Sequence, residues 1–225
     1  GRWDDQTYVF PMNFQLIHRV RATLGYSATA PKNYMDFYWN GGRWWDLLNV
    51  RYEFLRGKGG VPELREHSSM IPRFQLTRNI QTLGGRTFTD WILATADEPD
   101  AVVLDAYERQ KLPHEAMQLP GLKTSVQGNV QLLWETNRHM EINVETGMPA
   151  FLLTSERYDE GWRAYVDKSQ TPVVRCNGVL RGVWVPAGTH RVSFRFVPPK
   201  FLMGLAISTL YWLALGASLY LFRKR

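Results

Sequence analysis

The sequence predicts an α+β protein, in which a small mixed α/β N-terminal unit is followed by an antiparallel β-sandwich and one C-terminal transmembrane helix. Three patterns support this fold class: an uncharged apolar run near the C-terminus, short alternating segments before it, and mixed helical and strand patterns in the N-terminal part. We expect residues 1–105 to form the mixed extracytoplasmic unit, 106–199 the sandwich, 200–222 the membrane helix and 223–225 a cytoplasmic tail.

The C-terminal run from Phe201 to Phe222 contains no Asp, Glu, Lys, Arg, His, Asn, Gln or Pro. As a helix it would be about 33 Å long, because each residue adds about 1.5 Å, and this length crosses the hydrocarbon core of a bilayer. Three basic residues, 223–225, follow the run, whereas only Lys200 stands directly before it. Because basic residues are retained in the cytoplasm, we expect a cytoplasmic C-terminus and an extracytoplasmic domain.

Charge and cysteine content restrict the partners. The net charge is +6, of which the tail supplies three, and the remainder is too small to indicate nucleic-acid binding. Cys176 is the single cysteine, so it has no internal disulfide partner. The chain begins at Gly1 without an export signal, so we expect an upstream part whose transmembrane helices carry the domain across the bilayer. The expected partners are therefore the lipid bilayer and those helices.

Short strands are predicted along most of residues 107–197. The clearest is Arg191 to Val197, where apolar and polar side chains alternate. Asn177-Gly178 tolerates the positive φ angles of a tight hairpin turn, and Pro186-Ala187-Gly188 marks another turn. The other expected strands are 130–134, 140–144, 151–154, 162–166, 173–176 and 179–185.

The N-terminal part has mixed patterns. Apolar residues have helical spacing over 14–24, and 46–50 reads as a short helix that runs into a strand at 51–54. Residues 72–76 and 101–105 are predicted strands, and 90–96 is a predicted short helix. The strand at 101–105 fits either half of the chain, which leaves the exact boundary open.

Motifs for catalysis, metal binding and cofactors are missing from the sequence. Lys58 follows a glycine, but Gly59 stands where a phosphate-binding loop needs Ser or Thr. The five histidines have no second ligand at helical or hairpin spacing. Adjacent carboxylates such as Asp159-Glu160 do not converge as a glycosidase pair must. We therefore predict no catalytic, cofactor-binding or metal-binding residue, and no cofactor.

An aromatic cluster surrounds Asn40-Gly41-Gly42. Aromatic faces stack on sugars, so Trp39, Trp44 and Trp45 are candidate glycan contacts. Tyr34, Phe37 and Tyr38, however, have the spacing of a helix that packs into a core, which favours a core or domain-contact role for the cluster over a ligand surface.

Two C-terminal stretches carry a family resemblance. Residues 151–167 include Ser155, the pair Gly161-Trp162 and a following strand, and residues 181–190 read Arg-Gly-Val-Trp-Val-Pro-Ala-Gly-Thr-His before the apolar run. Together they resemble the C-terminal signature of the YfhO-type bacterial membrane proteins, and residues 46–52 are also similar to that family. The chain departs from the family pattern at Asp159-Glu160, where aromatic and proline are usual, and at Lys168-Ser169, where Gly usually closes the turn.

The resemblance implies a multi-spanning bacterial cell-membrane protein similar to the type C glycosyltransferases, which take sugars from polyprenyl-phosphate carriers outside the membrane. The acidic catalytic residues of those enzymes lie in an early loop that has no counterpart here, so no catalytic role transfers to this chain. The expected function is an accessory domain and anchor in glycosylation of cell-surface polymers, with polyprenyl-phosphate sugar or envelope glycan as ligand. The alternative is a non-catalytic glycan-binding or structural envelope module.

The same resemblance draws attention to Gly161 and Trp162. We expect Gly161 to hold a tight turn that suits glycine and Trp162 to fill the sandwich core; the alternative makes Trp162 a sugar platform. Asn177, Gly178, Pro186 and Gly188 are the other expected structural positions, all at turns.

Overall fold

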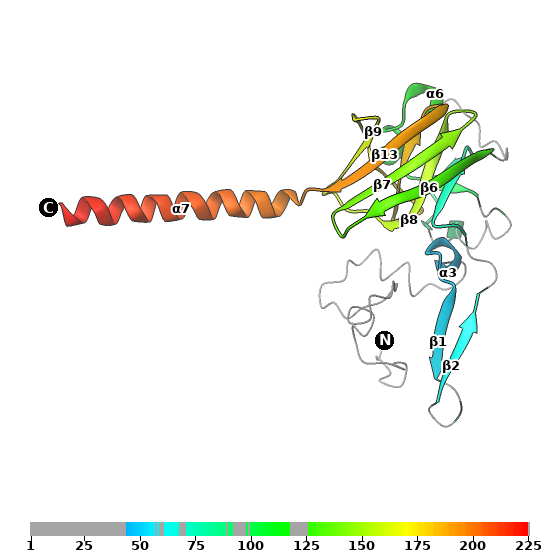
Figure 1. Ribbon diagram of the computed structural model, residues 1–225, viewed down its shortest axis with the longest axis horizontal. Helices are drawn as coiled ribbons and strands as arrows, with labels where there is room; N and C mark the ends of the chain where they lie inside the picture. The colour runs from blue at the N-terminus through cyan, green and yellow to red at the C-terminus, as the bar shows by residue number, and fades with distance from the viewer. Residues whose placement is uncertain are drawn as a thin grey trace.

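The computed structural model describes residues 44–56, 58, 61–67, 71–88, 90–91, 98, 100–117 and 126–224. Most of the strands pair antiparallel, with short helices between them and one long apolar helix at the C-terminal end, as the sequence predicts (Figure 1). The elements are α3 (Trp44–Leu47), β1 (Tyr52–Arg56), β2 (Pro62–Glu66), β3 (Phe74–Thr77), β4 (Ile80–Thr82), β5 (Val102–Leu104), α5 (Ala106–Arg109), α6 (His114–Met117), β6 (Gly128–Glu135), β7 (His139–Thr146), β8 (Ala150–Arg157), β9 (Trp162–Val166), β10 (Ser169–Thr171), β11 (Val174–Cys176), β12 (Leu180–Val185), β13 (Gly188–Phe196) and α7 (Pro199–Arg223).

Two antiparallel sheets form the sandwich. One has the strand order β10-β9-β13-β7-β6, and the other has the order β11-β12-β8-β3. Strand β7 shows why they stack: its residues alternate between buried and half-buried over most of its length. Side chains from both sheets meet in one core cluster, whose members are Met140, Ile142, Val144, Leu152, Ala164, Val183, Val185, Val192 and Phe194.

The four-stranded sheet is covered on both faces. All six residues of β12 are buried, as are the first five of β8. One face meets the five-stranded sheet, and the other meets β4, β5 and α6 in a second core cluster. Strands that are buried on both faces read as continuous apolar runs, which explains why 151–153 and 183–185 do not alternate. The sandwich is therefore the larger part of a layered domain.

The core crosses the expected boundary near residue 105. Strand β3, before that boundary, pairs with β8, and the parallel pair β4–β5 covers the four-stranded sheet. The second core cluster joins Leu47 and Ile80 to Phe151 and Trp184. The division near residue 105 stays a prediction, and residues on both sides of it share this cluster.

The described N-terminal elements match the predicted order of helix and strand. Helix α3 is followed by β1, and β1 forms an antiparallel hairpin with β2, which the sequence analysis did not predict. Strand β2 is mainly charged and exposed, so it lacks the alternation that identifies a half-buried strand. The predicted helix at 14–24 lies outside the described residues, and of 90–96 only Asp90 and Trp91, both helical, are described.

Helix α7 follows β13 after only Val197 and Pro198. In Figure 1 it projects away from the sandwich as an extended rod. Pro199 occupies the first turn, where its missing N–H costs nothing, and the hydroxyl of Thr209 donates to the carbonyl of Leu205 at 2.8 Å. Within the described residues it is the one helix long and apolar enough to cross a membrane, judged by length and composition.

Candidate functional site

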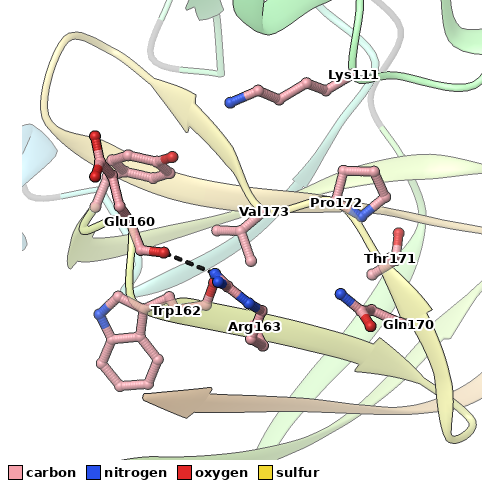
Figure 2. A pocket seen from close by; sticks show the side chains of 9 residues that line it. Lys111, Glu160, Trp162, Arg163, Gln170, Thr171, Pro172 and Val173 are labelled. Atoms are coloured by element: carbon pink, nitrogen blue, oxygen red, sulfur yellow. Dashed lines mark hydrogen bonds between the residues drawn. The ribbon is translucent and has the colours of Figure 1, made fainter. Parts of the chain in front are cut away.

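An open, polar hollow lies where the chain crosses from one sheet to the other (Figure 2). Its volume is about 250 Å³. Strands β9 and β10 form one wall, and Pro172 and Val173 carry the chain from β10 to β11 in the opposite sheet. The residues that line it are Lys111, Tyr158, Glu160, Trp162, Arg163, Gln170, Thr171, Pro172 and Val173. This combination offers aromatic edges, both signs of charge and neutral hydrogen-bonding groups.

Trp162 forms part of the wall and part of the core. Its ring packs against Phe196, with centroids 5.2 Å apart, and against the second sheet's Arg181, whose guanidinium carbon lies 3.9 Å from the ring centroid. Trp162 is half-buried, so it borders the sandwich core rather than filling it, and one of its faces is occupied by Arg181. An open sugar platform on that face is therefore excluded.

Arg181 is the buried cation of this region. Only 3% of its side chain is exposed, and it donates to the carbonyl of Arg157 at 2.7 Å while its guanidinium also lies 5.4 Å from the ring of Phe194. Such aromatic contacts stabilise a desolvated cation by about 2 kcal/mol. Arg181 belongs to the family motif, but its place in the sequence indicates no role, because its partners lie on three other strands.

Gly161 is required for close approach rather than for an unusual backbone angle. Its φ is not among the positive values of the described glycines. A Cβ atom at this position would lie 2.6 Å from the ring of Phe196, and the carbonyl of Gly161 accepts a 2.8 Å hydrogen bond from the N–H of Val197. The glycine therefore lets the β8–β9 turn pack onto the end of β13, next to α7.

Lys111 reaches the hollow from the side opposite Arg163 (Figure 2). Its ammonium group donates to both carboxylate oxygens of Glu108 at 2.8 Å and lies 4.7 Å from the ring of Tyr107. Burial disfavours the charge, but the hydrogen bonds and charge of Glu108 outweigh it, so the pKa of Lys111 is raised. Lys111 thus stays cationic at neutral pH.

Arg163 and the neutral groups complete the rim. One terminal nitrogen of Arg163 donates to the carbonyls of Glu160 at 2.7 Å and Trp162 at 3.1 Å, which fixes the guanidinium at the edge of the hollow (Figure 2). Gln170 and Thr171 add an amide and a hydroxyl from β10. No sequence pattern marks the lining residues together, since they lie on three separate segments of the chain.

Asn177 and Gly178 form the predicted β11–β12 turn, with φ values of 48° and 75°. The turn is buried rather than solvated. The Oδ1 atom of Asn177 accepts from the N–H of Val103 at 2.8 Å, and the Asn177 N–H donates back to the Val103 carbonyl at 2.9 Å. A Cβ atom at Gly178 would lie 2.7 Å from the ring of Phe88. The pair therefore joins the four-stranded sheet to β5.

Pro186 and Gly188 lie at the link between β12 and β13, which carries the chain from the four-stranded to the five-stranded sheet. Gly188 has a φ of 123°, a conformation that L side chains rarely adopt. The following His190 holds the link: its Nδ1 lies 2.5 Å from a carboxylate oxygen of Asp167, and its Nε2 lies 3.1 Å from the Ala187 carbonyl. Both partners only accept, so they favour the protonated ring and raise the pKa of His190.

The aromatic cluster lies mainly outside the described residues. Trp39 lies outside the described residues, and Trp44 and Trp45 are described only as the first two residues of α3. In the described part of the chain, no group of three or more His, Cys, Asp or Glu side chains could hold a metal ion. Cys176 is buried in the second core cluster, and burial raises the pKa of its thiol.

The comparisons with known proteins give one match. No curated protein and no solved structure matches the chain. The family model described as "Bacterial membrane protein YfhO" matches residues 104–208, from the end of β5 through every strand of the sandwich except β3 and into α7. The resemblance seen in the sequence is confirmed over residues 104–208, which match the model of the YfhO family of bacterial membrane proteins.

Proposed function

We propose that this chain is the extracytoplasmic accessory domain and membrane anchor of a multi-spanning bacterial glycosyltransferase-like protein that acts on cell-surface polymers. The observation that carries the proposal is the extent of the family match. It covers every strand of the sandwich except β3 together with the first part of α7, so the family match joins a β-sheet domain directly to a membrane segment. The glycosylation role follows from the family resemblance.

The hollow supports a role in holding a saccharide close to the membrane. It combines aromatic rings, neutral hydrogen-bonding groups and two cations, Lys111 and Arg163, which suit a sugar that carries a phosphate. Its Trp162 end is also the end at which β13 leads into α7, because Trp162 pairs with Phe196. A polyprenyl-phosphate sugar or a membrane-attached glycan would present its head group at this level.

The second candidate is a non-catalytic glycan-binding or structural envelope module. This candidate is favoured because the charged groups of the hollow already have protein partners: Lys111 is paired with Glu108, and Arg163 donates to backbone carbonyls. These groups are arranged to bind or brace rather than to transfer protons. The two candidates differ in whether the parent protein catalyses sugar transfer.

The orientation is tested by cysteine labelling in intact cells. Cysteines introduced at exposed positions before Lys200 should react with an impermeant thiol reagent, and one introduced after Phe222 should not. The native Cys176 provides a low background, because it is buried. Reaction only at the C-terminal position would reverse the proposed topology.

The role is tested on the full chain in lipid vesicles, incubated with polyprenyl-phosphate sugars and envelope polymer. We expect binding without sugar transfer, and Gln170→Ala should weaken binding while Gln131→Ala, on the edge strand β6 away from the hollow, should not. Transfer by this chain would contradict the accessory role. If the chain binds no saccharide, the proposed saccharide ligand is wrong and the structural alternative remains.

A further inference from the structure

The membrane-facing end of the sandwich is defined by strand register. Phe196 ends β13, and α7 begins three residues later. The N–H of Phe196 donates to the carbonyl of Arg138 at 2.8 Å, which fixes the β6–β7 turn beside the exit of β13. The turns at Gly147 and Ala187 lie at the opposite end, because Gly188 pairs with Thr146. Figure 1 shows the β6–β7 turn at the end of the sheet from which α7 departs.

Two large apolar side chains are exposed near this turn. Leu133 is 39% exposed and Trp134 is 44% exposed, although both belong to a strand whose other apolar residues pack inward. A β-bulge between Leu132 and Trp134 causes this: the pairing passes from Leu132–Ile142 to Trp134–Glu141 without using Leu133. Trp134 is further held edge-on against His139, with ring centroids 4.3 Å apart.

The patch lies close to the start of the membrane helix. Trp134 pairs with Glu141, which pairs with Ser193, three residues before Phe196, so it lies about 10 Å along the sheet from the end of β13. The two-residue link Val197–Pro198 is too short to let this end of the domain move far from the bilayer, and Val197 is itself 41% exposed.

Charge around the patch is compatible with lipid head groups. Arg138 in the turn and Arg195 at the end of β13 are both exposed. The nearby carboxylates of Glu135 and Glu156 share one guanidinium, because Arg73 lies 2.5 Å from the first and 2.7 Å from the second. Exposed Trp beside Arg, above an apolar helix, is the combination that settles at membrane interfaces.

We infer that the β6–β7 hairpin rests on the bilayer surface, with Leu133 and Trp134 among the lipid head groups. The occupant of this patch is the same bilayer that α7 enters, because the patch is continuous with the domain–helix junction. The contact would fix the tilt of the domain above the membrane. It requires neither a saccharide ligand nor a particular side of the membrane.

The test uses the full chain in vesicles, with an environment-sensitive fluorophore on one introduced cysteine. Asn137→Cys places the probe in the β6–β7 turn, and Ala187→Cys places it in the exposed turn at the far end of the sheet. Lipids that carry a quencher at the head group should quench the probe at 137 several-fold more strongly than the probe at 187. Equal quenching at the two positions would overturn the inference.

A second arm tests the two apolar side chains. In the Asn137→Cys background, Leu133→Ser with Trp134→Ser should reduce quenching at 137 severalfold. Val61→Ser, an exposed apolar change next to β2, is the matched control and should leave quenching unchanged. Near-ultraviolet circular dichroism checks that each variant keeps its fold. If the double variant is quenched as strongly as its parent, Leu133 and Trp134 do not contact lipid and the patch faces another partner.

Discussion

Asn177 offers a quantitative test of how the two halves of the domain are joined. Its Oδ1 atom accepts a 2.8 Å hydrogen bond from the buried N–H of Val103, and the residue has a left-handed backbone conformation with a φ of 48°. Removal of the acceptor leaves a buried N–H unpaired, which costs about 1–3 kcal/mol. The Nδ2 atom of Asn177 has no partner among the described atoms, so its removal offsets part of this loss.

Two substitutions separate the bond from the backbone. Asn177→Gly removes the acceptor and tolerates the left-handed conformation, so we expect it to lower the free energy of unfolding by about 2 kcal/mol. Asn177→Ala removes the same bond and adds about 1 kcal/mol of backbone strain, for a loss of about 3 kcal/mol.

The measurement is urea unfolding of the full chain in detergent micelles, followed by near-ultraviolet circular dichroism, which reports the domain rather than α7. Asn79→Ala is the control, because it shows how much stability is lost when the side chain of another buried asparagine is removed. If both Asn177 variants unfold like the parent, the hydrogen bond from Val103 to Asn177 contributes nothing to the free energy of unfolding. If Asn177→Gly is as destabilised as Asn177→Ala, the left-handed turn is not a source of strain.

Three further predictions concern the sandwich. Trp162→Ala should lower the free energy of unfolding by about 3 kcal/mol, the lower end for large aromatic truncations, because Trp162 is half-buried yet covers the buried Arg181. Trp162→Phe should lower it less, and a Trp162→Ala variant that unfolds in urea like the parent would refute the prediction. The His190–Asp167 pair raises the pKa of His190, so the stabilisation by this pair should be present below about pH 6.5 and be lost as pH rises through the folded-state pKa. The melting temperature of His190→Gln, measured against pH, should lack this decrease. Lys168→Gly should stabilise the domain by up to about 1 kcal/mol, because Lys168 has a φ of 74°; a lower melting temperature would contradict this.

Residue patterns predicted most of the fold. Strand β9 was predicted at 162–166, and the other sandwich strands except β10 were predicted to within a few residues of their ends, because alternation and turn residues are local signals. The short strand β10 was missed, since its turn at Asp167-Lys168 contains no glycine although both residues have positive φ. The covering layer of β4, β5 and α6 was also not foreseen, because burial on a second face depends on contacts between distant segments.

The candidate site was far less predictable. Trp162 was singled out through its family motif, but Lys111, Arg163 and Gln170 come together only after the chain crosses between sheets. Arg181 looks like an ordinary exposed residue in the sequence, and only the fold brings the rings of Trp162 and Phe194 to it. Single-sequence signals identify elements, whereas a hollow between elements is a property of their tertiary arrangement.

The position of β13 has a mechanical consequence. It lies between β9 and β7 and is bonded along both edges, and it continues into α7 after two residues. A force applied through the membrane helix therefore loads a central strand in shear, across two ladders of hydrogen bonds at once, rather than peeling an edge strand one bond at a time. Movements of the helix would be transmitted to the sheet as a whole, so the domain and its membrane helix would tilt together as one rigid body.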